Sequence, residues 1–371
     1  FLPRETLEEL PSWVPAKTVN LGLDLRGGAH LLYEADVELV IEERLSGILD
    51  TVRGDLRPAR IGYTGLSATR ETVSFSLTEP AAEEQALELV QRIVDEYNQA
   101  SAGLSGGFGL SQDLLLRNDG PNFTITMTEG ALADVATDAI AQSIEILRRR
   151  IDPDGTKEPT IQRQGFDRIL IQVPGEEDTE RLKRLIGTTA KMTFRFVDES
   201  TPLGEALAGR VPPGSELLPS SEVGGSGQAL TAYVVKKRIM VSGESLIDAQ
   251  PTFQQGAPVV SFRFDSIGAR KFGDATRDNV GRLFAIVLDD EVISAPVIRE
   301  PILGGNGVIS GSFNVQSAND LALLLRAGAL PAPLVVLEER SVGASLGQDA
   351  IEAGEFAAIV GLILVIVFMF L

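Results

Sequence analysis

The sequence contains no cysteine and a single histidine, His30, among its 371 residues. Without cysteine the chain has neither disulfides nor thiolate metal ligands. One histidine also argues against a His-rich metal centre and a Ser-His-Asp triad, so we expect His30 to be a packed or surface side chain. We therefore predict no catalytic residues, no metal site and no cofactor, and a chain that is not an enzyme.

Basic residues are also scarce. The 33 lysines and arginines stand against 52 aspartates and glutamates, a formal net charge of −19. Contacts to phosphates require clusters of Lys and Arg, so the balance excludes a nucleic-acid partner. Residues 100–120 are rich in Gly and Ser, but they contain no lysine and no G-x-x-x-x-G-K-[ST] motif, and we predict a loop there.

Two acidic clusters resemble functional sites only in part. Asp152, Asp154 and Gly155 match the opening of a calcium loop, but Arg163 stands where the closing Glu is needed, and we predict a turn. The consecutive carboxylates of residues 289–291 have no partner base, and neighbouring turn residues point apart. We predict a solvated turn there too.

The stretch from 19 to 37, VNLGLDLRGGAHLLYEADV, predicts two strands joined by a tight turn. Apolar and polar residues alternate up to Arg26, which is the pattern of a half-buried strand. Gly27 and Gly28 supply the positive φ angles of a hairpin turn. Asp24 and Arg26 are two residues apart, so they lie on the same polar face and form a structural motif beside the turn.

The longest apolar run lies at the end of the sequence. Residues 356–371, FAAIVGLILVIVFMFL, contain no charge, whereas a membrane-spanning helix needs about 20 such residues. We predict the start of a transmembrane helix, with a buried core helix as the alternative. At the other end no signal-peptide pattern is present. The proline-containing residues 1–18, with Trp13, suit a juxtamembrane linker.

Between the ends, an α-β-β-α-β pattern occurs twice. The expected elements of the first copy are helices at 37–56 and 80–98 and strands at 59–63, 72–77 and 122–128. Those of the second are helices at 132–151 and 178–186 and strands at 159–164, 168–173 and 191–197. A leading strand completes each copy to βαββαβ, the ferredoxin-like order. We assign the opening hairpin to the first copy and residues 122–128 to the second.

Residues 198–226 are rich in Pro, Gly and Ser, and we predict a hinge or flexible excursion there. A further α+β unit follows, with strands at 233–235, 258–264, 283–288 and 292–298 and a helix at 266–279. A short strand at 308–309, a helix at 318–327 and a strand at 333–338 precede the apolar end.

Several motifs in this order resemble the SecD family, the membrane-integrated accessory subunits of the bacterial Sec translocase. They are LGLDLRGG at 21–28, LRRRIDPDGTKEP at 147–159, IQRQGFDRILIQVP at 161–174, FAIVLDDEVISAP at 284–296, LRAGALPAPLVVLEE at 325–339 and SVGASLG at 341–347. The resemblance covers most of residues 19–355.

The resemblance implies an α+β fold on the periplasmic side of the inner membrane. Its base is ferredoxin-like (βαββαβ), with an inserted second ferredoxin-like module and an inserted α+β head, and a truncated transmembrane helix follows. The expected parts are the base at 19–37, 132–197 and 306–338, the inserted module at 38–131, the head at 198–305, a connector at 339–355 and the helix start at 356–371.

The resemblance also implies a role in protein export. The family is related to proton-driven transporters of the resistance-nodulation-division type. Its partners are SecF, the SecY/SecE/SecG channel and unfolded preprotein. The proton-conducting residues lie in helices outside this chain, so we assign none here.

We predict that the head binds emerging preprotein and moves about a base–head hinge to promote export driven by the proton-motive force. The expected hinge residues are Val197, Asp198, Glu199, Gly304 and Gly305. The expected preprotein contacts in the head are Leu217, Leu218 and Phe253. Two alternatives stay open: a small-molecule efflux domain, which predicts a deep apolar pocket, and a static scaffold, which predicts one fixed head orientation.

Overall fold

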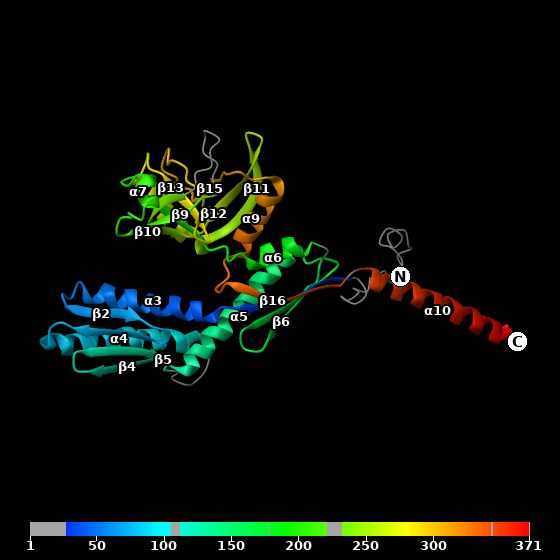
Figure 1. The fold of residues 1–371 in the computed structure, drawn as a ribbon, viewed down its shortest axis with the longest axis horizontal. Coiled ribbons are helices and arrows are strands. Elements are labelled where there is room, and N and C mark those ends of the chain that lie inside the picture. Colours follow the sequence, from blue (N-terminus) through cyan, green and yellow to red (C-terminus); the bar gives the residue numbers. More distant parts are fainter. Residues whose placement is uncertain (1–26, 105–111, 177, 221–231, 343, 371) are drawn as a thin grey trace.

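The computed structural model describes residues 27–104, 112–176, 178–220, 232–342 and 344–370. Figure 1 shows an elongated molecule in which a base at the centre is flanked by an inserted module on the left and a head above. Helix α10 projects on the right. Each of the three parts contains its own cluster of buried apolar side chains. The α+β class is confirmed, with four antiparallel sheets among the described residues.

The base is a four-stranded antiparallel sheet with two helices packed on one face. Its elements are β1 (Gly28–Ala35), α5 (Glu129–Ile151), β6 (Thr160–Gln164), β7 (Arg168–Pro174), α6 (Thr179–Gly187) and β16 (Leu334–Val342). The strand order β16-β1-β7-β6 is the ferredoxin-like order that the sequence predicts. Alternate residues of β1 and β7 are buried against the helices, as the period-2 pattern requires.

The hairpin predicted for residues 19–37 differs from the pairing that the structure shows for β1. Strand β1 pairs with β16 along one edge and with β7 along the other. Both edges are therefore occupied, and no edge is left for the predicted partner strand. Residues 19–26, including Asp24 and Arg26, lie outside the described residues.

The inserted module is a second four-stranded sheet, with order β2-β3-β5-β4. Its elements are α3 (Val37–Leu56), β2 (Tyr63–Ala68), β3 (Thr72–Leu77), the 3₁₀ turn η1 (Pro80–Ala82), α4 (Glu83–Leu104), β4 (Leu114–Asp119) and β5 (Asn122–Met127). The sheet order is that of a ferredoxin-like unit whose first strand, β5, comes last in the sequence.

Three predictions for this module are corrected. The repeat pattern assigned residues 122–128 to the second copy as its leading strand, but β5 pairs with β3 and β4, within the expected module at 38–131. The predicted loop at 100–120 contains the end of α4 and all of β4. Strand β2 lies later than the strand predicted at 59–63, and Gly65, with φ +66°, lies within it at a shift in the register with β3.

The head contains two sheets, with orders β14-β13-β8-β10-β9 and β11-β12-β15. Its strands are β8 (Met192–Val197), β9 (Ser215–Pro219), β10 (Ala232–Ser242), β11 (Leu246–Gln254), β12 (Ala257–Phe264), β13 (Phe284–Leu288), β14 (Glu291–Ser294) and β15 (Asn306–Ile309). Its helices are α7 (Leu203–Leu207), η2 (Gly243–Ser245), α8 (Ser266–Arg277) and α9 (Val315–Ala327).

A group of phenylalanines fills the space between the two head sheets. Their ring centroids lie 4.8–6.1 Å apart, in stacked, tilted and edge-on pairs. Such pairs add about 0.5–1.5 kcal/mol each beyond the burial of their surface. The residues are Phe194, Phe196, Phe262, Phe264, Phe272 and Phe284.

The extent of the head differs from the predicted boundaries of 198–305. Strand β8 pairs with β10 and β13, and β15 pairs with β12, so both belong to the head sheets. Helix α9 packs its Leu321 and Leu325 into the same phenylalanine core. The predicted flexible stretch at 198–226 contains α7 and β9, whereas residues 221–231 lie outside the described residues.

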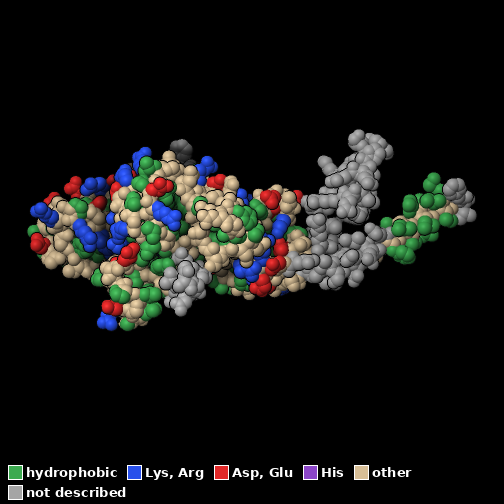
Figure 2. All heavy atoms as spheres, turned by 90° about the horizontal axis from the view of Figure 1, so that it is seen from above, with side chains coloured by type: hydrophobic (Ala, Val, Ile, Leu, Met, Phe, Trp, Pro, Cys, Tyr) green, Lys and Arg blue, Asp and Glu red, His purple; other side chains and the backbone are tan. Residues whose placement is uncertain are grey.

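Helix α10 (Ala344–Phe370) contains the predicted apolar run. Figure 2 shows its green apolar side chains at the right-hand end of the molecule, and residues from Phe356 to Met369 are exposed. Among the helices that the structure describes, none reaches the length and apolarity needed to cross a membrane. The start of a transmembrane helix at 356–371 stays a prediction.

Candidate functional site at the base–head junction

The chain crosses between base and head twice. Residues 188–191 lead from α6 to β8, and residues 328–333 lead from α9 back to β16. The two crossings contact each other, because the Leu330 amide donates to the Thr189 carbonyl at 2.8 Å. The whole covalent connection between the two parts therefore passes through one small region.

Arg150, in the last turn of α5, lies at the centre of this region and is 1% exposed. Its Nη1 donates to the carbonyls of Leu185 (3.0 Å) and Thr188. Its Nη2 donates to the carbonyls of Thr189 (3.0 Å) and Gly328 (2.9 Å). One guanidinium from the base thus binds both crossings.

The acceptors explain why a cation is stable there. Leu185 and Thr188 lie at the C-terminal end of α6, and Gly328 is the C-cap of α9 with φ +96°. Unpaired carbonyls at helix C-termini carry partial negative charge, so a buried cation satisfies them. Burial lowers the pKa of Arg150 to about 10, and the Asp289 carboxylate acts in the opposite direction. Arg150 is therefore charged at neutral pH.

Asp289 holds the first crossing from the head side. Its carboxylate accepts hydrogen bonds from the amides of Ala190 (2.9 Å) and Lys191 (2.8 Å) and from the Thr189 hydroxyl. Asp289 and Asp290 form the two-residue turn between β13 and β14, with φ angles of +48° and +62°. Positive φ at both positions is typical of a type I′ hairpin turn. The predicted turn is confirmed, but Asp289 is an acceptor for the junction rather than a free surface carboxylate.

Contacts between side chains surround this centre. Arg181 of α6 binds Asp320 of α9 at 2.8 Å, and the hydrogen bond to Asp320 raises the pKa of Arg181. Leu185, Ala190 and Leu324 form a small apolar cluster between base and head. A depression of about 210 Å³ beside the junction is lined by charged groups from the base and by Leu323 of the head.

The structure puts the predicted hinge residues inside the head. Val197 belongs to a buried cluster with Val235 and Ala285. The Asp198 amide donates to the Val234 carbonyl at 2.7 Å. Glu199 directly follows Asp198 in the same loop of the head.

The second predicted hinge segment is packed as well. The Gly305 carbonyl accepts from the Phe264 amide at 2.9 Å, and a Cβ added at Gly305 would lie 2.4 Å from the Cβ of Ala269. Gly304 precedes it on the surface. Neither segment connects head to base.

The predicted glycine motif and His30 lie in the base. Gly27 and Gly28 have φ angles of +69° and +138° and lead into β1, and the Gly27 carbonyl accepts from the Gly175 amide. The Nδ1 of His30 lies 3.1 Å from the Gln172 amide nitrogen on the neighbouring strand. The side chain of Asp152 caps the amides of Thr156, Lys157 and Glu158, which confirms the predicted turn.

The predicted preprotein contacts differ in exposure. Leu218 is 7% exposed and belongs to a buried cluster, and Leu217 is half-buried, so Leu218 is a core residue. Phe253 is 66% exposed near the end of β11.

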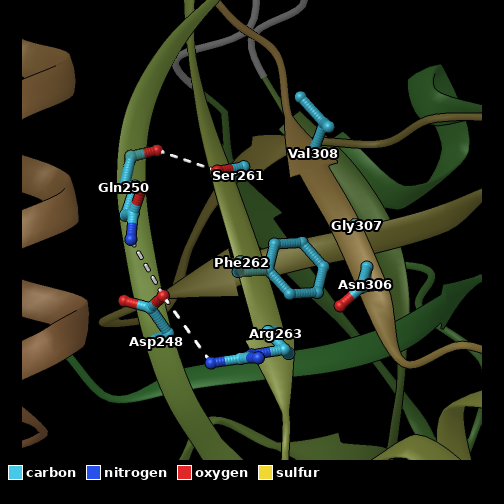
Figure 3. A pocket seen from close by; sticks show the side chains of 8 residues that line it. All are labelled: Asp248, Gln250, Ser261, Phe262, Arg263, Asn306, Gly307 and Val308. Carbon is cyan, nitrogen blue, oxygen red and sulfur yellow. Dashed lines mark hydrogen bonds and ion pairs between the residues drawn. The ribbon is translucent and has the colours of Figure 1, made fainter.

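Figure 3 shows the depression along β11, β12 and β15. Its charges are paired with each other: Asp248 accepts from Gln250 at 3.0 Å and lies 3.9 Å from Arg263. The Ser261 hydroxyl donates to the Gln250 carbonyl. This open depression, lined by both polar and apolar groups, differs from the deep apolar pocket that the efflux alternative predicts.

Neither Arg150 nor the contact of Asp289 with the junction was predicted from the sequence. Arg150 follows Ser143 and Leu147 at helical spacing, and both of these are buried. This places Arg150 on the buried face of α5, whereas Arg148 and Arg149 bind Glu145 on the exposed face. A charged residue at a buried position of an amphipathic helix is the sequence feature from which Arg150 could have been predicted.

Comparisons with known proteins agree with this architecture. The chain matches three family descriptions: the SecDF P1 head subdomain over residues 215–332, the N-terminal part of the P1 domain of protein translocase subunit SecDF over 140–199, and the SecD/SecF GG motif over 12–38. The head match includes β15 and α9, consistent with the strand pairing.

Curated relatives match almost the whole chain. Protein translocase subunit SecD of Acetobacter pasteurianus is 43% identical over 100% of this chain and 68% of its own length. Protein translocase subunit SecD of Rickettsia bellii is 42% identical over 96% of this chain and 65% of its own length. The chain thus spans about two thirds of the length of these relatives.

Among solved structures, the crystal structure of SecDF in its super-membrane-facing form matches with 28% identity and a TM-score of 0.50. It covers 95% of this chain and 35% of that chain. The likeness supports the same arrangement of elements over most of the present chain.

Proposed function

The chain belongs to the SecD family of protein translocase subunits, and we propose that it promotes protein export by moving its head relative to its base. The family is one of transport components and not of enzymes. The activity, substrate and partners of the complete protein are part of the proposal, because the chain spans only about 65% of the length of the Rickettsia relatives.

The observation that carries the proposal is the narrow junction. Base and head have separate apolar cores, and the chain crosses between them through two short segments held at one guanidinium. Domains with separate cores and a small connecting region move relative to one another at low cost.

The proposed substrate is an unfolded preprotein that emerges from the translocation channel. Phe253, Ile247 and Leu303 are exposed apolar side chains of the head, at 66%, 56% and 69%. Exposed apolar side chains of this size suit weak, sequence-tolerant contacts with an extended polypeptide. The proposed partners are SecF and the SecY/SecE/SecG channel, and the energy comes from the proton-motive force through helices outside this chain.

We place the protein in the bacterial inner membrane, with base, head and inserted module on the periplasmic side. The exposed apolar residues of α10 support this assignment, since an unburied apolar helix surface is costly in water. In this proposal residues 356–371 begin a membrane helix.

Site-specific photocrosslinking tests the substrate. A photoreactive amino acid replaces Phe253 of the head in the full-length protein, and Phe166, a 53% exposed aromatic of the base, serves as the matched position. We expect crosslinks between Phe253 and a translocating preprotein, and far fewer at Phe166. Equal labelling at both positions would contradict capture by the head.

The static scaffold is the competing function. A static scaffold would use the same exposed surfaces for binding, but its head would keep a single orientation during export. Locking the head therefore separates the two functions, because a scaffold tolerates the lock.

A further inference from the structure

We propose that Arg150 is the pivot of the base–head junction: it sets the orientation of the head and is the point about which the head turns. Its relevance to export rests on the proposed head movement. The orientation of the head is measured without any export assay, so the two ideas are tested separately.

The hydrogen-bond geometry favours a pivot over an ordinary buried ion pair. Nη1 binds carbonyls at the end of α6 and in the first crossing, and Nη2 binds one carbonyl in each crossing. The planar fork of the guanidinium holds these acceptors in fixed directions, which a lysine ammonium does not do. If the head moves while the four Arg150 hydrogen bonds stay intact, the guanidinium and its acceptors keep nearly the same positions relative to the base.

The position of Arg150 on the base strengthens the argument. Arg150 lies on the buried face of α5, whose Ile146, Leu147 and Ile151 are core residues of the base. The guanidinium is therefore fixed to the base, while Thr189 is held to the head through Asp289. Arg150 and Asp289 bind the same short segment from opposite sides.

The exposed ion pairs near the junction are better suited to change than to serve as an axis. The Arg181 side chain is 37% exposed in its pair with Asp320, and Lys191 pairs with Glu43 of the inserted module through largely exposed side chains. Exposed ion pairs contribute only about 0–1 kcal/mol each. They therefore exchange partners readily, whereas breaking the buried Arg150 bonds removes a donor from each of four carbonyls at once.

The test measures head orientation in the full-length protein in lipid nanodiscs, after replacement of any cysteine outside the present chain. Spin labels on Gln142 of α5 and Lys271 of α8 report the base–head distance by electron paramagnetic resonance, and labels on Lys271 and Arg238 report a distance within the head. All three side chains are exposed. The variants are R150K and R150M, with R149M as the matched neighbour.

We expect R150M to shift and broaden the base–head distance distribution, and R150K to do so to a smaller extent. R149M leaves it unchanged, and the distance within the head is unchanged in every folded variant. The unchanged distance within the head shows that the head keeps its fold, so the shift in the base–head distance reports a change in head orientation.

An unchanged base–head distribution in folded R150M would overturn the inference. If R150M does not fold, R150K decides, because it keeps the positive charge and most of the stem, and an unchanged R150K distribution overturns the inference equally. A variant with altered orientation and normal export would instead contradict the proposed function and leave the pivot intact.

Discussion

Arg150 differs from its two arginine neighbours only by its position on the helix. Arg148 and Arg149 form exposed pairs with Glu145 at 3.2 and 3.3 Å, and such pairs contribute little to stability. Arg150 is buried at the base–head junction, where its Nη1 and Nη2 donate to four carbonyls. The same residue type thus serves as a solvated charge at two positions and as a structural centre at the third.

Asp198 is the second residue whose environment decides its behaviour. Its carboxylate accepts hydrogen bonds from the hydroxyls of Ser200 and Ser215, both at 2.6 Å, and these bonds lower its pKa from 3.8 to about 2. Because the pKa is lower in the folded state, Asp198 stabilises the fold above about pH 4. This stabilisation is lost as the pH falls towards 2.

We predict that S215A raises the pKa of Asp198 towards 3.8, because it removes one of the two hydroxyl donors. The carboxyl carbon of Asp198, followed by NMR during an acid titration, measures the shift. S261A is the control, since the Ser261 hydroxyl donates to the Gln250 carbonyl on another sheet. An unchanged pKa in S215A would mean that Ser215 does not hold the carboxylate.

At the scale of elements, the helices and central strands were predictable from local pattern. Helix α3 and strand β3 begin and end as predicted, because apolar spacing and turn residues near 37 and 72 are local signals. The partners of the strands were not predictable in this way. Strand β5 follows the inserted helices in the sequence and leads directly into α5, yet its pairing with β3 depends on contacts between distant residues.

The predicted hinge shows the limit of composition as a guide. Two adjacent glycines, Gly304 and Gly305, are typical of a flexible segment. At Gly305, however, the glycine is required because α8 packs against it and leaves no room for a Cβ. Of the two true crossings, the one at 188–191 contains neither Gly nor Pro, whereas the one at 328–333 contains Gly328, Pro331 and Pro333. Composition therefore marks only the second crossing. Glycine indicates a special backbone conformation or a close approach, and only the structure distinguishes these from mobility.

A pair of alanine substitutions tests this interpretation. G305A puts a Cβ 2.4 Å from Ala269 and forces a side chain at φ +66°, whereas the nearest atom to a Cβ at Gly304 is 3.7 Å away. We predict that G305A lowers the stability of the head by about 2–3 kcal/mol and that G304A has little effect. Hydrogen exchange of the head amides measures the difference. Equal protection in both variants would show that Gly305 is not packed as described.

At the scale of the whole molecule, the resemblance to the SecD family identified the base, the inserted module and the head from ordered motifs. The boundaries between these three parts could be drawn only from the structure. For example, β8, β15 and α9 belong to the head because their side chains fill its phenylalanine core. The junction was beyond prediction, because it joins residues 150, 189, 289 and 328 from four separate parts of the sequence. No local pattern brings these residues together.

The central claim is that the head must move relative to the base during export. The Arg181–Asp320 pair joins α6 of the base to α9 of the head, and the Lys183–Glu339 pair, at 3.0 Å, joins α6 to β16 within the base. Replacing each pair by two cysteines in the full-length protein gives a lock and its matched control. Both double variants react with the same short, reducible bifunctional thiosulfonate.

The measurement is release of a secreted protein from spheroplasts before and after bridging, and again after reduction. We predict that the Arg181→Cys/Asp320→Cys bridge halts release and that reduction restores it, whereas the Lys183→Cys/Glu339→Cys bridge has no effect. Undiminished release with a verified bridge between α6 and α9 would contradict the moving head and favour the static scaffold.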